Sequence, residues 1–179
     1  MRPRRAATPK ERRRRSRPQN EPRRLPFGAV PESNATVTLG EVGDDNVQAV
    51  IDLSVSPGQS QFVAPNVKSL AQAFATTKVW VRAVYADDDL VGFVMLSDDA
   101  DKPRYYLWRF MIDQRYQGLG YGRQAMTLVH QYVRSRPAGD RIYLSYVPED
   151  GGPEPFYKSL GYEDTGVERG GELEAVLHL

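Results

Sequence analysis

Arg115-Tyr116-Gln117-Gly118-Leu119-Gly120-Tyr121-Gly122-Arg123 carries three glycines at alternate positions, after a strand-like run and before an amphipathic helix. Glycine lets the backbone approach a ligand closely, so that consecutive N–H groups at a helix start can point at one anion. The stretch therefore predicts a phosphate-binding loop, in which the backbone N–H groups of residues 117–122 hold a pyrophosphate.

Two common phosphate loops do not fit this stretch. The dinucleotide-binding fingerprint needs a third glycine at position 123, which is Arg123. The ATP-binding pattern ends in Gly-Lys-Ser/Thr, whereas Arg123 and Gln124 follow Gly122 here. The ligand is expected to be a different phosphate compound.

The composition is that of one globular domain with a tail. The chain has 179 residues, of which 40% are hydrophobic and 26% charged. It has no cysteine, which excludes disulfides and thiolate nucleophiles, and only two histidines, so no metal site is expected. No apolar run approaches the roughly 18 residues that a membrane span needs. The simplest expectation is a cytoplasmic protein without membrane contact.

The charge is distributed unevenly along the chain. Residues 1–24 hold 11 basic and 2 acidic residues, which leaves 13 basic and 21 acidic residues, a net charge of −8, for the remainder. An acidic domain attracts cations and repels nucleic acid. Residues 1–34 are rich in arginine and proline and are expected to be disordered. Arg12–Arg15 could tether nucleic acid, but the composition favours a solvated segment without a partner.

The apolar pattern from residue 35 onward predicts elements in the order β, α, α, β, β, β, α, β, α, β, β. The long helix should begin near Gly120 and stop before Pro137. In the helix that follows Pro65, spacings of 3, 4 and 7 predict one buried face made of four apolar residues, namely Val67, Leu70, Ala71 and Phe74.

A second motif, Phe156-Tyr157-Lys158-Ser159-Leu160-Gly161-Tyr162, lies downstream. With Arg115, Gly118 and Gly120 it resembles the GNAT N-acetyltransferases, whose acetyl-CoA motif is Gln or Arg, two residues, Gly, any residue, then Gly or Ala. The resemblance covers residues 35–179. It implies an α/β (α+β) fold with a mixed, mostly antiparallel sheet of six to seven strands and about four helices, splayed between the fourth and fifth strands.

The resemblance also implies the acetyl-CoA site. Backbone N–H groups near residues 110–112 would polarise the thioester carbonyl, and the glycine loop would hold the pyrophosphate. The coenzyme-binding residues expected on this basis are Phe110, Met111, Ile112, Arg115, Gln117, Gly118, Leu119, Gly120, Tyr121, Gly122 and Arg123.

Residues 59–71, 108–113 and 141–146 look like the diamine, or spermine/spermidine, acetyltransferase branch of that family. A polyamine is a polycation, which agrees with the acidic domain. The acceptor pocket is expected at Gln61, Asn66 and Trp108. The sequence does not decide between a monomer and a homodimer.

In this family the amine attacks the thioester directly, and Tyr157 stands where the family places the general acid that protonates the departing thiolate. Removing the proton of an alkylammonium at pH 7 costs about 4 kcal/mol. Glu149, reached through a water, is a candidate base, and a solvated loop acid is an equally good interpretation of it. Asp150 and Pro153 depart from the family pattern in this loop.

Two alternatives to a polyamine acetyltransferase stay open. The same fold could acetylate an aminoglycoside or a peptide N-terminus. It could also be a non-enzymatic acyl-CoA sensor that the basic tail tethers to nucleic acid.

Overall fold

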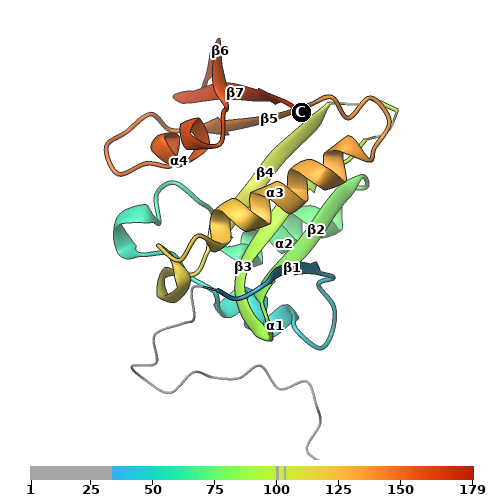
Figure 1. The fold of residues 1–179 in the computed structure, drawn as a ribbon, viewed down its shortest axis with the longest axis vertical. Coiled ribbons are helices and arrows are strands. Elements are labelled where there is room, and N and C mark those ends of the chain that lie inside the picture. Colours follow the sequence, from blue (N-terminus) through green and yellow to red (C-terminus); the bar gives the residue numbers. More distant parts are fainter. Residues whose placement is uncertain (1–33, 100, 103) are drawn as a thin grey trace, which may run out of the picture.

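The computed structural model describes residues 34–99, 101–102 and 104–179. The predicted tail therefore lies outside the described residues, except for Asn34. The described strands form one sheet in the order β1-β2-β3-β4-β5-β7-β6 (Figure 1). They are β1 (Val37–Gly40), β2 (Val79–Ala86), β3 (Asp89–Ser97), β4 (Tyr105–Ile112), β5 (Arg141–Tyr146), β6 (Glu163–Arg169) and β7 (Glu172–His178). The helices are α1 (Val47–Asp52), α2 (Asn66–Ala75), α3 (Tyr121–Arg134) and α4 (Glu154–Ser159), with 3-10 turns η1 (Pro57–Gln59) and η2 (Gln114–Tyr116).

Strands β4 and β5 form the one parallel pair of the described sheet, and they part soon after they meet. Their register runs only from Tyr105 opposite Ile142 to Leu107 opposite Leu144. Beyond Leu107, β4 continues to Ile112 paired with β3 alone. The mixed, mostly antiparallel sheet with a splay between its fourth and fifth strands confirms the expected fold, and Figure 1 shows β5, β7 and β6 turning away from β4.

Helices cover both faces of the sheet. In Figure 1, α3 crosses in front of the sheet and α1 and α2 lie behind it. Residues of α3 and α4 pack in one hydrophobic cluster, and residues of α1 and α2 pack in a second one. Each face of β2 to β4 is thus buried, which explains why β3 is apolar along almost its whole length.

Helix α3 follows the sequence pattern closely. Its apolar residues recur at helical spacing, and the fully buried ones are Ala125, Met126, Val129 and Val133. The helix begins after Gly120, which is left-handed at φ 83°, and it ends at Arg134, before Pro137. The start of α3 is therefore fixed next to the end of β4.

The buried face predicted for α2 is wrong for Val67, Ala71 and Phe74, whereas Leu70 is half-buried and packs on the second hydrophobic cluster. Val67 is 54% exposed and Phe74 is 96% exposed, whereas Asn66 and Ser69 are buried. The Asn66 side chain donates a hydrogen bond to the Val50 carbonyl at 2.8 Å. This contact with α1 turns the polar residues of α2 inward, because a buried amide needs a partner. The apolar spacing identified the helix, but its contact with Val50, 16 residues earlier in the chain, determines which face of the helix is buried.

His130 on α3 titrates unusually because it is buried against Tyr162, whose hydroxyl lies 3.0 Å from Nε2. Burial, helped by the charge of Arg134, lowers the pKa of His130 to about 4, against about 6.5 in an unfolded chain. Between these values, the unfolded chain binds a proton that the folded protein excludes.

The free energy of unfolding should therefore fall as the pH drops from about 6.5 to about 4, by up to about 3 kcal/mol from His130 alone. Urea unfolding at several pH values, in the wild type and in His130→Gln, measures this contribution. The substituted protein should lose the part of the pH dependence that lies in this window. Parallel pH curves for the two proteins would contradict the assignment.

Candidate active site

A cavity of about 800 Å³ lies in the splay between β4 and β5. The end of β4, the glycine loop, the end of β5, residues 151–157 and the segment from Val55 to Ala64 form its walls. Of the residues predicted for the site, those that line it are Gln61, Trp108, Phe110, Met111, Ile112, Gln117, Gly118, Gly120, Tyr121, Gly122, Arg123 and Tyr157.

The glycine loop has the geometry of a phosphate cradle. Gly118 and Gly120 have φ of +78° and +83°, and a Cβ atom at either would meet no protein atom within 4 Å. The first i→i−4 hydrogen bond at the helix start runs from Gln124 N to Gly120 O at 3.2 Å. The N–H groups of residues 121–123 precede this bond and lie at the positive end of α3. The loop thus offers donors and open space to an anion.

Asp113 ties this loop to the rest of the fold. Its buried carboxylate accepts hydrogen bonds from the backbone N–H of Ser54 at 3.0 Å and from Arg115, through N at 3.0 Å and Nε at 2.7 Å. Burial tends to raise the pKa of Asp113, but these donors outweigh it and keep the pKa below its usual value. The ionised Asp113 therefore caps the loop, and it is engaged too fully to act as a base.

The side chains around the loop hold it to neighbouring segments. Gln117 Nε2 donates to Ile112 O at 2.8 Å and to Gln59 Oε1 at 3.0 Å. The Arg123 guanidinium donates to Ser159 at the end of α4, at 2.8 Å and 3.1 Å. Arg115 and Leu119 do not line the cavity: Arg115 pairs with Asp113, and Leu119 packs on the core.

Tyr157 on α4 lies in an aromatic cluster, and it is the tyrosine of that cluster whose hydroxyl makes no hydrogen bond to a described residue. Tyr146 and Tyr162 pack around its ring at centroid distances of 6.3 Å and 5.7 Å. Tyr146 donates its hydroxyl to Asp164 at 2.6 Å, and Tyr162 bonds to His130. The Tyr157 hydroxyl has no hydrogen-bond partner among the described residues. Burial raises the pKa of Tyr157, so this hydroxyl stays protonated at neutral pH.

The residues predicted for the acceptor do not all come together. Gln61 and Trp108 line the cavity. Glu149 does not line it; its exposed carboxylate lies 3.4 Å from Gln61 Nε2. Asn66 does not line the cavity; its buried amide holds α1 to α2 and lies 3.8 Å from the Sδ atom of Met111, which does line it.

Several residues that line the cavity were not among the predicted site residues, and Tyr106, Ser145 and Glu172 are three of them. Tyr106 could have been found, because it lies two residues before Trp108 on the same strand and side chains alternate between faces. Glu172 begins β7 at the turn of a hairpin, and no local pattern marks it.

Two further observations concern the described part of the chain only. No three His, Asp or Glu side chains gather there in a way that would suit a metal ion. None of its helices combines the length and the apolar character of a membrane span.

Comparison with known proteins identifies the family. The model of the acetyltransferase (GNAT) family matches residues 42–162. The chain belongs to the GNAT family. It is 30% identical over 137 residues to the spermine/spermidine N(1)-acetyltransferase of Bacillus subtilis, which covers 73% of this chain and 90% of that protein.

Solved GNAT-like structures share the fold. The PaiA N-acetyltransferase of Thermoplasma acidophilum, in complex with coenzyme A, has a TM-score of 0.63 at 10% identity, over 80% of this chain and 99% of that one. Naa50 of Arabidopsis thaliana, in complex with the bisubstrate analogue CoA-Ac-MVNAL, has a TM-score of 0.60 at 22% identity, over the same shares. This GNAT protein is an acetyl-CoA-dependent N-acetyltransferase.

Substitution of Gly120 by Ala should weaken acetyl-CoA binding at least 10-fold. The methyl group strains a left-handed backbone by about 1–2 kcal/mol and extends into the open space of the loop. Titration calorimetry with coenzyme A measures the loss.

Gly166→Ala is the matched control, because Gly166 also has a positive φ, +79°, and open space around it, but it lies on β6 outside the cavity. It should reduce stability to a similar extent and leave coenzyme affinity intact. Equal affinities of the Gly120 variant and the wild type would remove this loop from the coenzyme site.

Proposed function

We propose that this enzyme acetylates a diamine or polyamine, and that a primary amine of the acceptor attacks the thioester of acetyl-CoA directly. The observation that carries the proposal is the 30% identity, over 73% of the chain, to a spermine/spermidine N(1)-acetyltransferase. The cavity between β4 and β5 supports it, because residues of the glycine loop, Tyr157 and Trp108 line one space.

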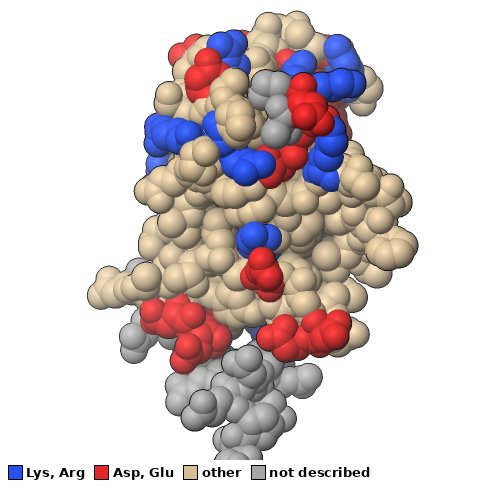
Figure 2. All heavy atoms as spheres, turned by 90° about the vertical axis from the view of Figure 1, so that its right-hand side faces the viewer, with Lys and Arg blue, Asp and Glu red and all other residues tan. Residues whose placement is uncertain are grey.

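The charge of the enzyme supports a cationic acceptor. Outside residues 1–24 the net charge is −8. On the face shown in Figure 2, acidic side chains gather at one end, charges of both signs gather at the other, and a mostly uncharged band lies between. A negative field raises the local concentration of a polycation and its rate of association.

The backbone of β4 would bind the acetyl end of the coenzyme. Past Leu107, the edge of β4 that faces β5 has no strand partner in the described sheet. Backbone N–H groups there need partners, and a thioester carbonyl and a pantetheine amide would provide them. An N–H aimed at the carbonyl oxygen would stabilise the oxyanion that forms as the amine attacks.

The proton on the amine must leave before or during attack. A water between the amine and the Glu149 carboxylate would receive it, and the contact between Glu149 and Gln61 would hold that carboxylate at the rim of the cavity. At the other end of the reaction the C–S bond breaks, and the Tyr157 hydroxyl donates its proton to the thiolate.

The decisive experiment measures thiol release from acetyl-CoA with purified enzyme and a panel of acceptors. Spermidine, spermine and simple diamines should give the highest kcat/KM, because the field and the cavity favour a polycation. Aminoglycosides and peptides with a free N-terminus complete the panel. A higher kcat/KM for either of these classes would overturn the polyamine assignment.

Substitution of Tyr157 by Phe should lower kcat about 100-fold or more and leave the KM for acetyl-CoA nearly unchanged, since only the proton donor is lost. Tyr162→Phe is the control: it removes a hydroxyl from the same cluster that is bonded to His130 instead of facing the cavity. Steady-state kinetics of both variants test the role. An unchanged kcat in Tyr157→Phe would exclude it.

A further inference from the structure

A second, smaller cavity of about 310 Å³ opens beside the first. It lies where β4, β5 and the β6–β7 hairpin meet. Four residues line both cavities, and they are Tyr106, Trp108, Ser145 and Glu172. The two cavities therefore share a wall at the point where β4 and β5 part.

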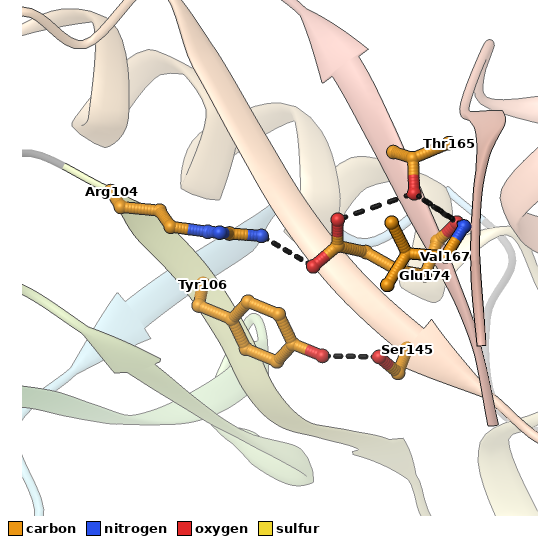
Figure 3. A network of polar contacts seen from close by, with 6 residues as sticks. All are labelled: Arg104, Tyr106, Ser145, Thr165, Val167 and Glu174. Carbon is orange, nitrogen blue, oxygen red and sulfur yellow. Dashed lines mark hydrogen bonds and ion pairs between the residues drawn. The ribbon is translucent and has the colours of Figure 1, made fainter. Parts of the chain in front are cut away.

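Most polar groups of the second cavity already have partners (Figure 3). Glu174 pairs with Arg104 and accepts a hydrogen bond from Thr165 Oγ1 at 3.2 Å. The Arg104 guanidinium also lies over the Tyr143 ring, 4.3 Å from its centroid. Glu174 is thus a neutralised, structural carboxylate that holds β7 to β4.

A separate hydrogen bond in Figure 3 joins Tyr106 to Ser145. The two side chains point toward each other from β4 and β5, close to the last paired position, Leu107 opposite Leu144. The bond links the two strands where their pairing ends and fixes the Tyr106 ring in the shared wall.

Glu172 differs from Glu174, although both side chains border the second cavity from alternate positions of β7. Among the described residues, the Glu172 carboxylate forms no hydrogen bond or ion pair, and its cross-strand neighbour on β6 is Arg169. The aromatic rings of Tyr106 and Trp108 lie in the same shared wall. An unpaired carboxylate beside two aromatic faces is an environment that favours an alkylammonium ion.

We propose that Glu172, which borders both cavities, binds the second, non-reacting ammonium group of the acceptor while the reacting amine attacks the thioester in the larger cavity. This inference rests on the proposed function and names the residue that selects a diamine over a monoamine. The reacting amine must lose its charge, and an ion pair with a carboxylate would hinder that loss. The second ammonium stays charged, so it is the group that gains from Glu172.

The chain between the two nitrogens would pack on Trp108 and Tyr106. Arg169 also borders the second cavity. The positive charge of Arg169 repels a cation and would favour an anionic acceptor. Arg169 and Glu172 therefore favour ligands of opposite charge. Substitution of each one separately reveals which charge the cavity recognises.

The experiment compares KM for a diamine and for a monoamine of the same chain length in the wild type and in Glu172→Gln. The diamine KM should rise about 10-fold, with little change for the monoamine or for acetyl-CoA. Arg169→Gln should leave the diamine KM unchanged or lower it.

Two control substitutions each remove one negative charge, as Glu172→Gln does. Glu168→Gln, on the exposed strand β6 and outside both cavities, measures the loss of the general field and should change the diamine KM less than 2-fold. Glu174→Gln should lower the melting temperature more than Glu172→Gln does and should raise the diamine KM less.

The outcomes separate the two proposals. Wild-type enzyme that acetylates no diamine contradicts the proposed function. Diamine turnover with an unchanged KM in Glu172→Gln, or an equal rise in Glu168→Gln, overturns the role of Glu172 alone. A larger KM increase in Arg169→Gln than in Glu172→Gln overturns it as well, because the cavity would then recognise an anion.

Discussion

The parting of β4 from β5 is the constraint on which the rest of this structure depends. The two strands pair at only three positions and then separate. Each loses a neighbour that a regular sheet would provide, and unpaired backbone groups buried in protein are costly. The loss is tolerable because the gap is a cavity that a ligand can fill. Beyond the gap, β7 pairs with β5 and β6 pairs with β7, so the second half of the sheet joins the first half through β5.

Polar contacts fix the residues on both sides of this gap, and none of these contacts uses the Tyr157 hydroxyl. On one side, Asp113 binds the backbone of Ser54 and Arg115 and fixes the entrance to the glycine loop. On the other, Tyr146 and Tyr162 direct their hydroxyls to Asp164 and His130, away from Tyr157. The rings of these two tyrosines give Tyr157 a rigid, apolar surround. Preorganisation of this kind lets a donor act without first reorienting.

The sequence predicted those parts of the site whose geometry is local. The glycine loop could be located because positive φ angles, a strand end and a helix start fall within nine residues, and Tyr157 could be located from its family motif. The exposed face of α2 could not be predicted, because the bond from Asn66 to Val50 turns the helix. Glu172 could not be found either, since its position depends on β7 pairing with β5 beside the splay. The predicted basic tail falls outside the described residues, so its role stays a prediction.

Net charge alone is a poor guide to where a cationic acceptor would bind in this enzyme. Several acidic side chains already have cationic partners: Asp99 and Asp101 both bind Lys78, and Asp98 binds Arg136. Such paired carboxylates contribute little to the attraction of a ligand, because their fields are cancelled nearby and screened by salt. What distinguishes a binding carboxylate is that it lacks a partner and borders a cavity. Glu172 meets both conditions and Glu174, two residues away, meets only the second. Under the proposed function, the −8 charge would bring a polycation to the surface and Glu172 would select it.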